Sequence, residues 1–306
     1  MPQGSTETRH PASEGLHRLP GEQVLARLLD AQAEALGAVR AALPDLDRAA
    51  EAGAQAIHIG GRMAYAGAGS SGLMAISDAL ELAGTFGIPP SQTPVLFAGG
   101  AGALLAMTGA VEDDENSAEA DVDRAGLGAG DLLVAVSASG TTPYVLAAVK
   151  AAQARGAAVM GVTNVAGSPL LGLAEHPVLL DTGPELVAGS TRMGAGTAQK
   201  VALNMFSTLV GIRLGHVHDG YMVNIVADNA KLRDRAKRMV QAISGQGEDI
   251  SARALDRTGG RVKPAVLIAL GASEEEAENA LREAEGRLDA AIERCTTQIT
   301  TTGRAP

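Results

Sequence analysis

The chain has 306 residues, which is enough for one large α/β domain or for a core with a smaller appended domain. Its 25 Lys and Arg residues and 35 Asp and Glu residues give a formal charge of −10, which argues against a general nucleic-acid or anionic membrane surface. Three Tyr, three Phe and no Trp leave few rings for stacking bases. The single Cys295 excludes an internal disulfide, and no apolar leader or membrane-length run is found, so we expect a cytoplasmic protein.

Residues 1–20 are polar and rich in turn formers, and they predict an N-terminal arm. Helical spacing of apolar residues begins at Glu22 and is stopped by Pro44, and a second helix is predicted over 46–57. The middle of the chain then alternates between strands and helices. The predicted strands are 62–66, 94–98, 131–136, 158–163 and 177–181, and the helices between them are 74–82, 116–124 and 143–155. This alternation predicts an α/β fold with a doubly wound parallel sheet.

The C-terminal part of the chain reads as helical. A stripe of apolar residues predicts a buried helix, and it consists of Val201, Met205, Leu209 and Ile212. Helical periodicity continues beyond Asn229, with a linker expected at 258–263 and a capping box from Ser273 to Glu276. We therefore divide the chain into an arm (1–20), a sheet domain with its N-terminal helices (21–244) and a helical tail (245–306).

Two loops rich in glycine and hydroxyl groups follow predicted strands. Gly67-Ala-Gly-Ser-Ser-Gly72 matches the dinucleotide fingerprint, but the acid expected about 20 residues later is missing, which argues against NAD. Ser137-Ala-Ser-Gly-Thr-Thr142 precedes Pro143 at a helix start. Backbone amides at helix starts bind phosphate, and the hydroxyls that would assist them are Ser70, Ser71, Ser137, Ser139 and Thr142. The alternative is that both loops only cap their helices.

These two loops and a third segment, Gly183-Pro-Glu-Leu-Val-Ala-Gly-Ser-Thr-Arg-Met-Gly-Ala-Gly-Thr-Ala-Gln-Lys200, resemble a sugar-isomerase (SIS) domain of the N-acetylmuramic acid 6-phosphate etherase family. The likeness runs from Thr6-Glu-Thr-Arg9 into the helical tail. It implies an enzyme that releases D-lactate from a cell-wall sugar phosphate without metal or organic cofactor. It also implies a homodimer and adds four residues to the expected binding site, namely Ser190, Thr191, Arg192 and Lys200.

The resemblance places the family's two catalytic acids at Glu81, in Asp78-Ala-Leu-Glu81, and at Glu115, in Glu112-Asp-Asp-Glu115. Glu112 is the neighbour with which Glu115 could be confused. Independently of the family, ether loss next to an acidic carbon needs a base for the proton and an acid for the leaving oxygen, which two carboxylates can provide. In the alternative without a catalytic role, Glu81 is a solvent-exposed carboxylate on a helix, and the acidic cluster only stabilises the N-terminus of a helix.

The chain departs from the family pattern at three cations, because Leu73, Thr141 and Gly194 stand where Arg, Arg and Lys are usual. Leu82-Ala-Gly84 also replaces a Cys-Pro-Pro turn. These departures keep two other functions open, a sugar-phosphate-binding regulator without catalysis and an aldose–ketose isomerase. His216 and His218 alternate in sequence and lack a third ligand at suitable spacing, so a metal site is not expected.

Overall fold

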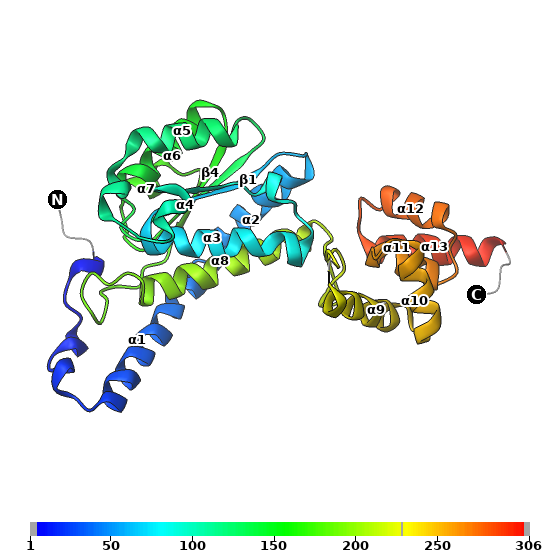
Figure 1. Cartoon of the computed structure of the whole chain (residues 1–306), viewed down its shortest axis with the longest axis horizontal. Coiled ribbons are helices and arrows are strands. Elements are labelled where there is room, and N and C mark those ends of the chain that lie inside the picture. The colour runs from blue at the N-terminus through cyan, green and yellow to red at the C-terminus, as the bar shows by residue number, and fades with distance from the viewer. Residues whose placement is uncertain (1–4, 228, 303–306) are drawn as a thin grey trace. The chain divides into compact units, whose positions relative to one another are not determined.

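The computed structural model describes residues 5–227 and 229–302 (Figure 1). The chain forms two compact units, which are described separately. Unit 1 comprises the residues up to Leu80 together with Pro90–Leu209, and unit 2 comprises Glu81–Pro89 and the residues from Val210 onward. In the described part of the chain, no helix is both long and apolar enough to cross a membrane.

Unit 1 is built on one sheet of five parallel strands in the order β2-β1-β3-β4-β5. The strands are β1 (Met63–Gly67), β2 (Val95–Phe97), β3 (Leu132–Val136), β4 (Ala158–Thr163) and β5 (His176–Leu179). All five correspond to predicted strands, so the predicted α/β fold with a parallel sheet is confirmed. The central strands β1 and β3 are buried along their whole length, as expected when helices cover both faces.

Helices lie on both faces of this sheet (Figure 1). They are α2 (Leu43–His58), α3 (Gly69–Phe86), α4 (Gly100–Ala103), α5 (Glu115–Ala125), α6 (Pro143–Ala154), α7 (Pro169–Leu173) and α8 (Gly194–Arg213). Helix α1 (Gly21–Ala41) precedes them and extends away from the sheet (Figure 1). Alternate strand residues such as Ala66 and Leu133 share one apolar core with Val122 of α5 and Val149 of α6. Tyr65, the neighbour of Ala66 in β1, points to the other face, where it donates a hydrogen bond to Asp78 of α3.

Asp78 fixes α3 to its neighbours. Only 2% of this aspartate is exposed, and its carboxylate accepts hydrogen bonds from three side chains. The donors are Tyr65 Oη of β1 at 2.8 Å, Asn204 Nδ2 of α8 at 2.7 Å and Ser207 Oγ of α8 at 2.9 Å. A buried carboxylate is stable only when such donors surround it. The network therefore holds α3, whose first residues form the site described below, against β1 and α8.

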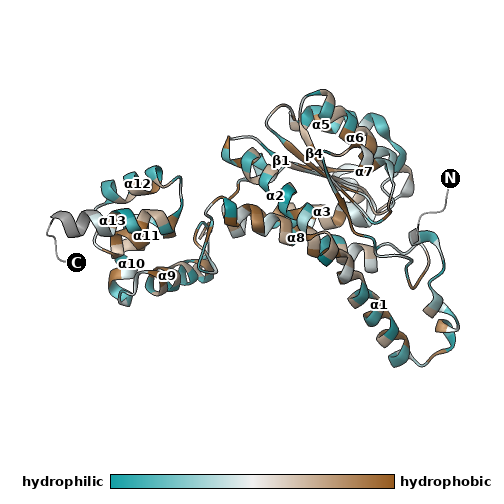
Figure 2. Cartoon of the chain, turned by 180° about the vertical axis from the view of Figure 1, so that it is seen from behind, coloured by the Kyte–Doolittle hydropathy of each residue, from teal (hydrophilic) through white to brown (hydrophobic). Residues whose placement is uncertain are grey.

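The buried face of α8 is not the one that the sequence predicted. The buried residues of the helix are Ala202, Leu203, Phe206 and Val210, whereas Met205 is 41% exposed and Ile212 is 48% exposed. The inner face thus combines alanines with larger apolar side chains, and Met205 and Ile212 of the predicted stripe are left accessible. Helix α1 behaves similarly, with Leu25 67% exposed and Leu29 68% exposed, and apolar residues recur along it in Figure 2.

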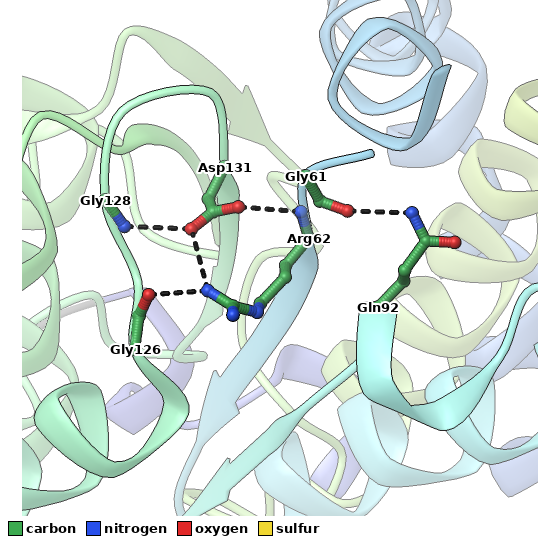
Figure 3. A network of polar contacts seen from close by, with 6 residues as sticks. All are labelled: Gly61, Arg62, Gln92, Gly126, Gly128 and Asp131. Atoms are coloured by element: carbon green, nitrogen blue, oxygen red, sulfur yellow. Dashed lines mark hydrogen bonds and ion pairs between the residues drawn. The ribbon is translucent and has the colours of Figure 1, made fainter. Parts of the chain in front are cut away.

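The amino-terminal edge of the sheet is held by Asp131, which precedes β3 (Figure 3). Its carboxylate accepts hydrogen bonds from Arg62 N at 2.7 Å and Gly128 N at 2.8 Å. It also pairs with the Arg62 guanidinium at 3.5 Å. Gln92 Nε2 donates to Gly61 O at 2.9 Å, which ties the start of β1 to the segment before β2. Asp131 therefore joins the turns before β1 and β3 at the edge opposite the loops of interest.

Unit 2 contains a short hairpin and five helices among its described residues. They are β6 (Val217–His218), β7 (Tyr221–Met222), α9 (Ala230–Ser244), α10 (Glu248–Arg257), α11 (Val262–Ala269), α12 (Glu274–Glu283) and α13 (Leu288–Thr302). Met239, Val266 and Leu281 from three of these helices belong to one apolar core. The expected boundary between residues 244 and 245 falls inside this unit, between α9 and α10.

Two finer predictions for unit 2 differ in outcome. The capping box at Ser273 and Glu276 is confirmed, because both reciprocal hydrogen bonds are present. The linker expected at 258–263 is confirmed over 258–261, which connect α10 to α11, but its last two residues, Val262 and Lys263, are buried in α11. Thr and Gly end α10 locally, and the apolar run that follows packs into the core of the same unit. Of the predicted arm and tail, residues 1–4 and 303–306 lie outside the described residues.

Candidate functional site

The loop between β1 and α3 brings the first hydroxyl cluster to the carboxyl edge of the sheet. Gly67 and Gly72 pass so closely that a Cβ on Gly67 would lie 2.6 Å from the Cα of Gly72, so glycine is required. Ser70 and Ser71 follow at the start of α3. Ser71 Oγ accepts a hydrogen bond from Ala138 N at 3.2 Å. This contact joins the first loop directly to the second.

The second loop, between β3 and α6, is folded around Ser137. Its Oγ accepts a hydrogen bond from Gly140 N at 3.0 Å and lies 2.8 Å from Thr142 Oγ1. Gly140 has a φ of +66°, and a Cβ there would lie 2.3 Å from Ser168 Oγ, so only glycine fits. The loop thus turns tightly, leaves Ser139 exposed and ends with Pro143 in the first turn of α6.

A pocket of about 350 Å³ lies where these loops meet, entirely within unit 1. Its lining joins five segments that are far apart in the sequence. The lining residues are Thr6, Glu7, Ala68, Gly69, Ser70, Ser71, Met107, Glu112, Ala138, Ser139, Thr142, Gly189 and Thr191. Ser70, Ser71, Ser139, Thr142 and Thr191 are predicted site residues that line it, and Ser137 supports it through Thr142. Neither lysine nor arginine is among these lining residues.

The N-terminal arm contributes residues that the sequence analysis did not single out. Gly189 N donates to Thr6 O at 3.1 Å, and Ser13 Oγ donates to Leu186 O at 2.6 Å. These bonds fasten the arm to the loop before α8 and bring Glu7 into the pocket. The only signal in the sequence was the family likeness of Thr6 and Glu7, because a contact between residues so distant in the chain leaves no local pattern.

The third helix start, that of α8, is occupied by the protein itself. Glu185 is 5% exposed, and its carboxylate accepts hydrogen bonds from Gly194 N at 2.9 Å and Ala195 N at 2.8 Å. A carboxylate at a helix N-terminus satisfies amides and the helix dipole together. A Cβ on residue 194 would lie 3.2 Å from Glu185 Oε2, so glycine leaves room for this contact. The amides of Gly194 and Ala195 are therefore already engaged within the protein.

The two candidate second acids occupy different positions. Glu112, in the 3₁₀ segment η5 (Gly109–Asp113), is half-buried and lines the pocket. Its Oε1 lies 2.8 Å from where a Cβ on Gly69 would be, beside the start of α3. Burial and the neighbouring Asp113 carboxylate raise the pKa of Glu112 above its ordinary value. Glu115 is the first residue of α5 and is exposed.

The other predicted residues lie outside the pocket that one chain forms. Glu81 is exposed on α3, about 16 Å farther along the helix axis than Ser70 at about 1.5 Å per residue. Arg192 and Lys200 are exposed and Ser190 is half-buried. None of these four is among the lining residues. The structure thus brings together the hydroxyls of the two loops and Thr191, but it leaves Ser190, Glu81, Glu115 and the two cations outside the pocket.

The described residues contain no group of three or more His, Cys, Asp or Glu side chains that could hold a metal ion. His216 lies before β6 and His218 lies in it, both in unit 2. The buried Nδ1 of His216 has no hydrogen-bond partner in the described structure. Burial and, to a lesser extent, the nearby charge of Lys263 lower the pKa of His216 to about 4.

Comparison with known proteins identifies the class of fold and then the family. Residues 29–164 match the SIS domain family, which includes both loops of the pocket. Among solved structures, a phosphoheptose isomerase from Francisella tularensis is 16% identical, with a TM-score of 0.49, and the match covers 63% of this chain and 100% of that one.

Relatives that match over nearly the whole chain are more specific. An N-acetylmuramic acid 6-phosphate etherase from Deinococcus radiodurans is 45% identical over 92% of this chain and 92% of its own length. A protein of the same name from Rubrobacter xylanophilus is 40% identical over 94% of this chain and 95% of its own length. The chain belongs to the N-acetylmuramic acid 6-phosphate etherase family.

Proposed function

We propose that this protein is an enzyme that cleaves the D-lactyl ether of N-acetylmuramic acid 6-phosphate, giving N-acetylglucosamine 6-phosphate and D-lactate. The observation that carries the proposal is the similarity to etherases, which extends through both units and not only through the SIS domain. The pocket supports it, because helix-start amides and hydroxyls suit a phosphate.

The proposed reaction is an elimination followed by the addition of water. In the open-chain sugar the aldehyde acidifies the proton on C2, a carboxylate removes it, and the bond from C3 to the lactyl oxygen breaks as that oxygen is protonated. Water then adds at C3 and a proton returns to C2. We assign this acid–base work to Glu81 and Glu115, with Glu112 as the alternative to Glu115. No metal or organic cofactor is expected for these steps.

Phosphate binding is assigned to the two loops that line or support the pocket, with Ser71, Ser139 and Thr142 as the principal hydroxyls. Ser70, Ser137, Ser190, Thr191, Arg192 and Lys200 complete the proposed substrate-binding set. Because Glu81 and Glu115 are exposed outside the pocket of one chain, we propose that a second copy completes the site. The accessible apolar residues of α1 and α8 support a homodimer, since such residues are usually covered.

A cytoplasmic location is proposed from the composition. Cys295, the only cysteine, is buried, so the chain forms no internal disulfide of the kind that marks exported proteins.

The function is tested by incubating the purified protein with N-acetylmuramic acid 6-phosphate and measuring D-lactate. We expect lactate and N-acetylglucosamine 6-phosphate in equal amounts. Glu81→Gln should lower kcat by about 10² to 10⁴ and change KM by no more than a few fold, because the acid–base group acts in the transition state. A ketose product without lactate would indicate an isomerase, and binding without any turnover would indicate a regulator.

In deuterated water the product should carry deuterium at C2. If Glu81 and Glu115 divide the work, one of their two Gln variants should still exchange the C2 proton of the substrate without expelling lactate. Loss of both exchange and lactate release in Glu81→Gln alone would assign both steps to that residue. A wild-type rate in Glu81→Gln would remove it from the mechanism.

A further inference from the structure

The charge of the pocket is unexpected for a phosphate site. Anions are usually bound by lysine or arginine through charge-assisted hydrogen bonds. Here the lining residues include the carboxylates of Glu7 and Glu112 and no basic side chain. Arg192 and Lys200 are exposed and lie outside the lining, so they add no positive charge to it. A free anion that enters the pocket therefore meets favourable amides and hydroxyls and also two like charges.

The carboxylate of Glu112 lies at the helix start where an anionic ligand would bind. Its Oε1 lies beside Gly69, at the start of α3, where the helix dipole favours an anion. The carboxylate thus occupies the electrostatic position that a small anion would take at this helix start. Because half-buried charges are screened less than exposed ones, its repulsion of a phosphate in the same pocket is strong. Burial of Glu112 against the pocket wall would be unfavourable unless its oxygens met donors there.

Glu7 enters the pocket from the opposite end of the sequence. Its Oε2 lies 3.0 Å from where a Cβ on Gly189 would be, and the backbone bond from Gly189 N to Thr6 O holds the segment. Thr6 itself is 1% exposed, so the segment is fixed by packing as well. Ionised carboxylates are acceptors only, and the complementary donors on a ligand are hydroxyl and amide N–H groups. Two fixed acceptors thus suit the uncharged part of an amino-sugar phosphate.

We propose that Glu7 and Glu112 determine specificity in this pocket. They accept hydrogen bonds from hydroxyl or amide N–H groups of the sugar, and their charge weakens the binding of anions that lack the sugar. The assignment rests on the proposed function only in taking a sugar phosphate as the ligand. Its consequence is that inorganic phosphate competes poorly with the phosphorylated sugar although both share the phosphate group.

The test is calorimetric binding to the full chain at pH 8, with inorganic phosphate and with N-acetylglucosamine 6-phosphate as separate probes. The variants are Glu7→Gln and Glu112→Gln, and Glu119→Gln, an exposed carboxylate of α5, is the matched control. The ratio of the two dissociation constants isolates the sugar's contribution, because the phosphate is common to both probes. Thermal unfolding of each variant confirms that it is folded.

In Glu112→Gln, phosphate should bind at least threefold more tightly and the preference for the phosphorylated sugar should fall at least tenfold. Glu7→Gln should also lower that preference, and Glu119→Gln should leave both values within twofold. Partial unfolding would weaken both probes, so tighter phosphate binding cannot arise from it.

Unchanged or weaker phosphate binding in Glu112→Gln overturns the proposal, and an unchanged preference removes that residue from it. If the wild-type protein does not bind N-acetylglucosamine 6-phosphate, this proposal fails, whereas the proposed function is decided separately by lactate release. If the binding changes occur as expected but the protein releases no lactate, the proposed function alone is overturned.

Discussion

Lys263 gives a prediction whose magnitude follows from the structure. The side chain belongs to α11 of unit 2 and is 8% exposed. Its Nζ donates to Gly286 O at 2.8 Å. Burial therefore lowers the pKa of Lys263 from an ordinary 10.5 to about 8.

The sign of the pH effect follows from proton binding. Between about pH 8 and 10.5 the unfolded chain holds a proton on Lys263 that the folded chain has released, so the stability of the fold rises with pH in this window. Since each tenfold change in proton affinity corresponds to about 1.4 kcal/mol, the buried ammonium costs about 3 kcal/mol at pH 7. About 2 kcal/mol of that cost is relieved by pH 9.5.

The measurement is the free energy of unfolding from urea titrations of the wild-type protein and Lys263→Met at pH 7 and pH 9.5. The difference between the two proteins removes the contributions of other titrating groups. It should move by about 2 kcal/mol in favour of the wild type as the pH rises. Lys150→Met, which removes an exposed lysine of α6, controls for the loss of one positive charge. A constant difference between wild type and Lys263→Met would refute the reasoning.

Three further predictions follow from contacts in unit 1. Ser139→Ala should weaken binding of the sugar phosphate by about 1 kcal/mol without lowering the unfolding temperature, and unchanged affinity in calorimetry would contradict the role of this hydroxyl. Asp131→Ala should destabilise the protein by about 2 to 3 kcal/mol because two backbone N–H groups lose their acceptor, while kcat measured at low temperature stays near the wild-type value. Replacing Leu25 and Leu29 of α1 with Ser should shift a dimer toward monomer in light scattering, and a fully active wild-type monomer at micromolar concentration would rule out the shared site.

The sheet and the two loops could be predicted from the sequence because each signal is local. Continuous apolar runs mark buried parallel strands, and a glycine with hydroxyl neighbours after such a run marks a helix start. The topology then places those starts at one edge, which is why Ser71 and Ser139 were found without any contact being known. The two loops lie side by side because β1, which precedes the first, pairs with β3, which precedes the second. The hydrogen bond from Ala138 N to Ser71 Oγ follows from this pairing.

What the sequence did not reveal depends on contacts between distant segments. Apolar periodicity on α8 marked Met205 and Ile212, but the side that packs inward carries Ala202 and Phe206, because the neighbouring elements decide which face is covered. The same limit hid Glu7, which reaches the pocket only through the pairing of Thr6 with Gly189. The role of Glu185 was also hidden, since an acid before a helix start shows no partner until the chain is folded.

The hydrogen bond from Ala138 N to Ser71 Oγ spans 67 positions of the sequence and joins the two loops. A loop pair connected in this way has little conformational freedom left to lose when a ligand arrives, so association needs no ordering step. We therefore expect the ligand to bind to a pocket that is already formed, without closure of the two loops. The two loops should also respond to mutation together, because a change at Ser71 removes the acceptor of Ala138 N and so loosens the turn around Ser139.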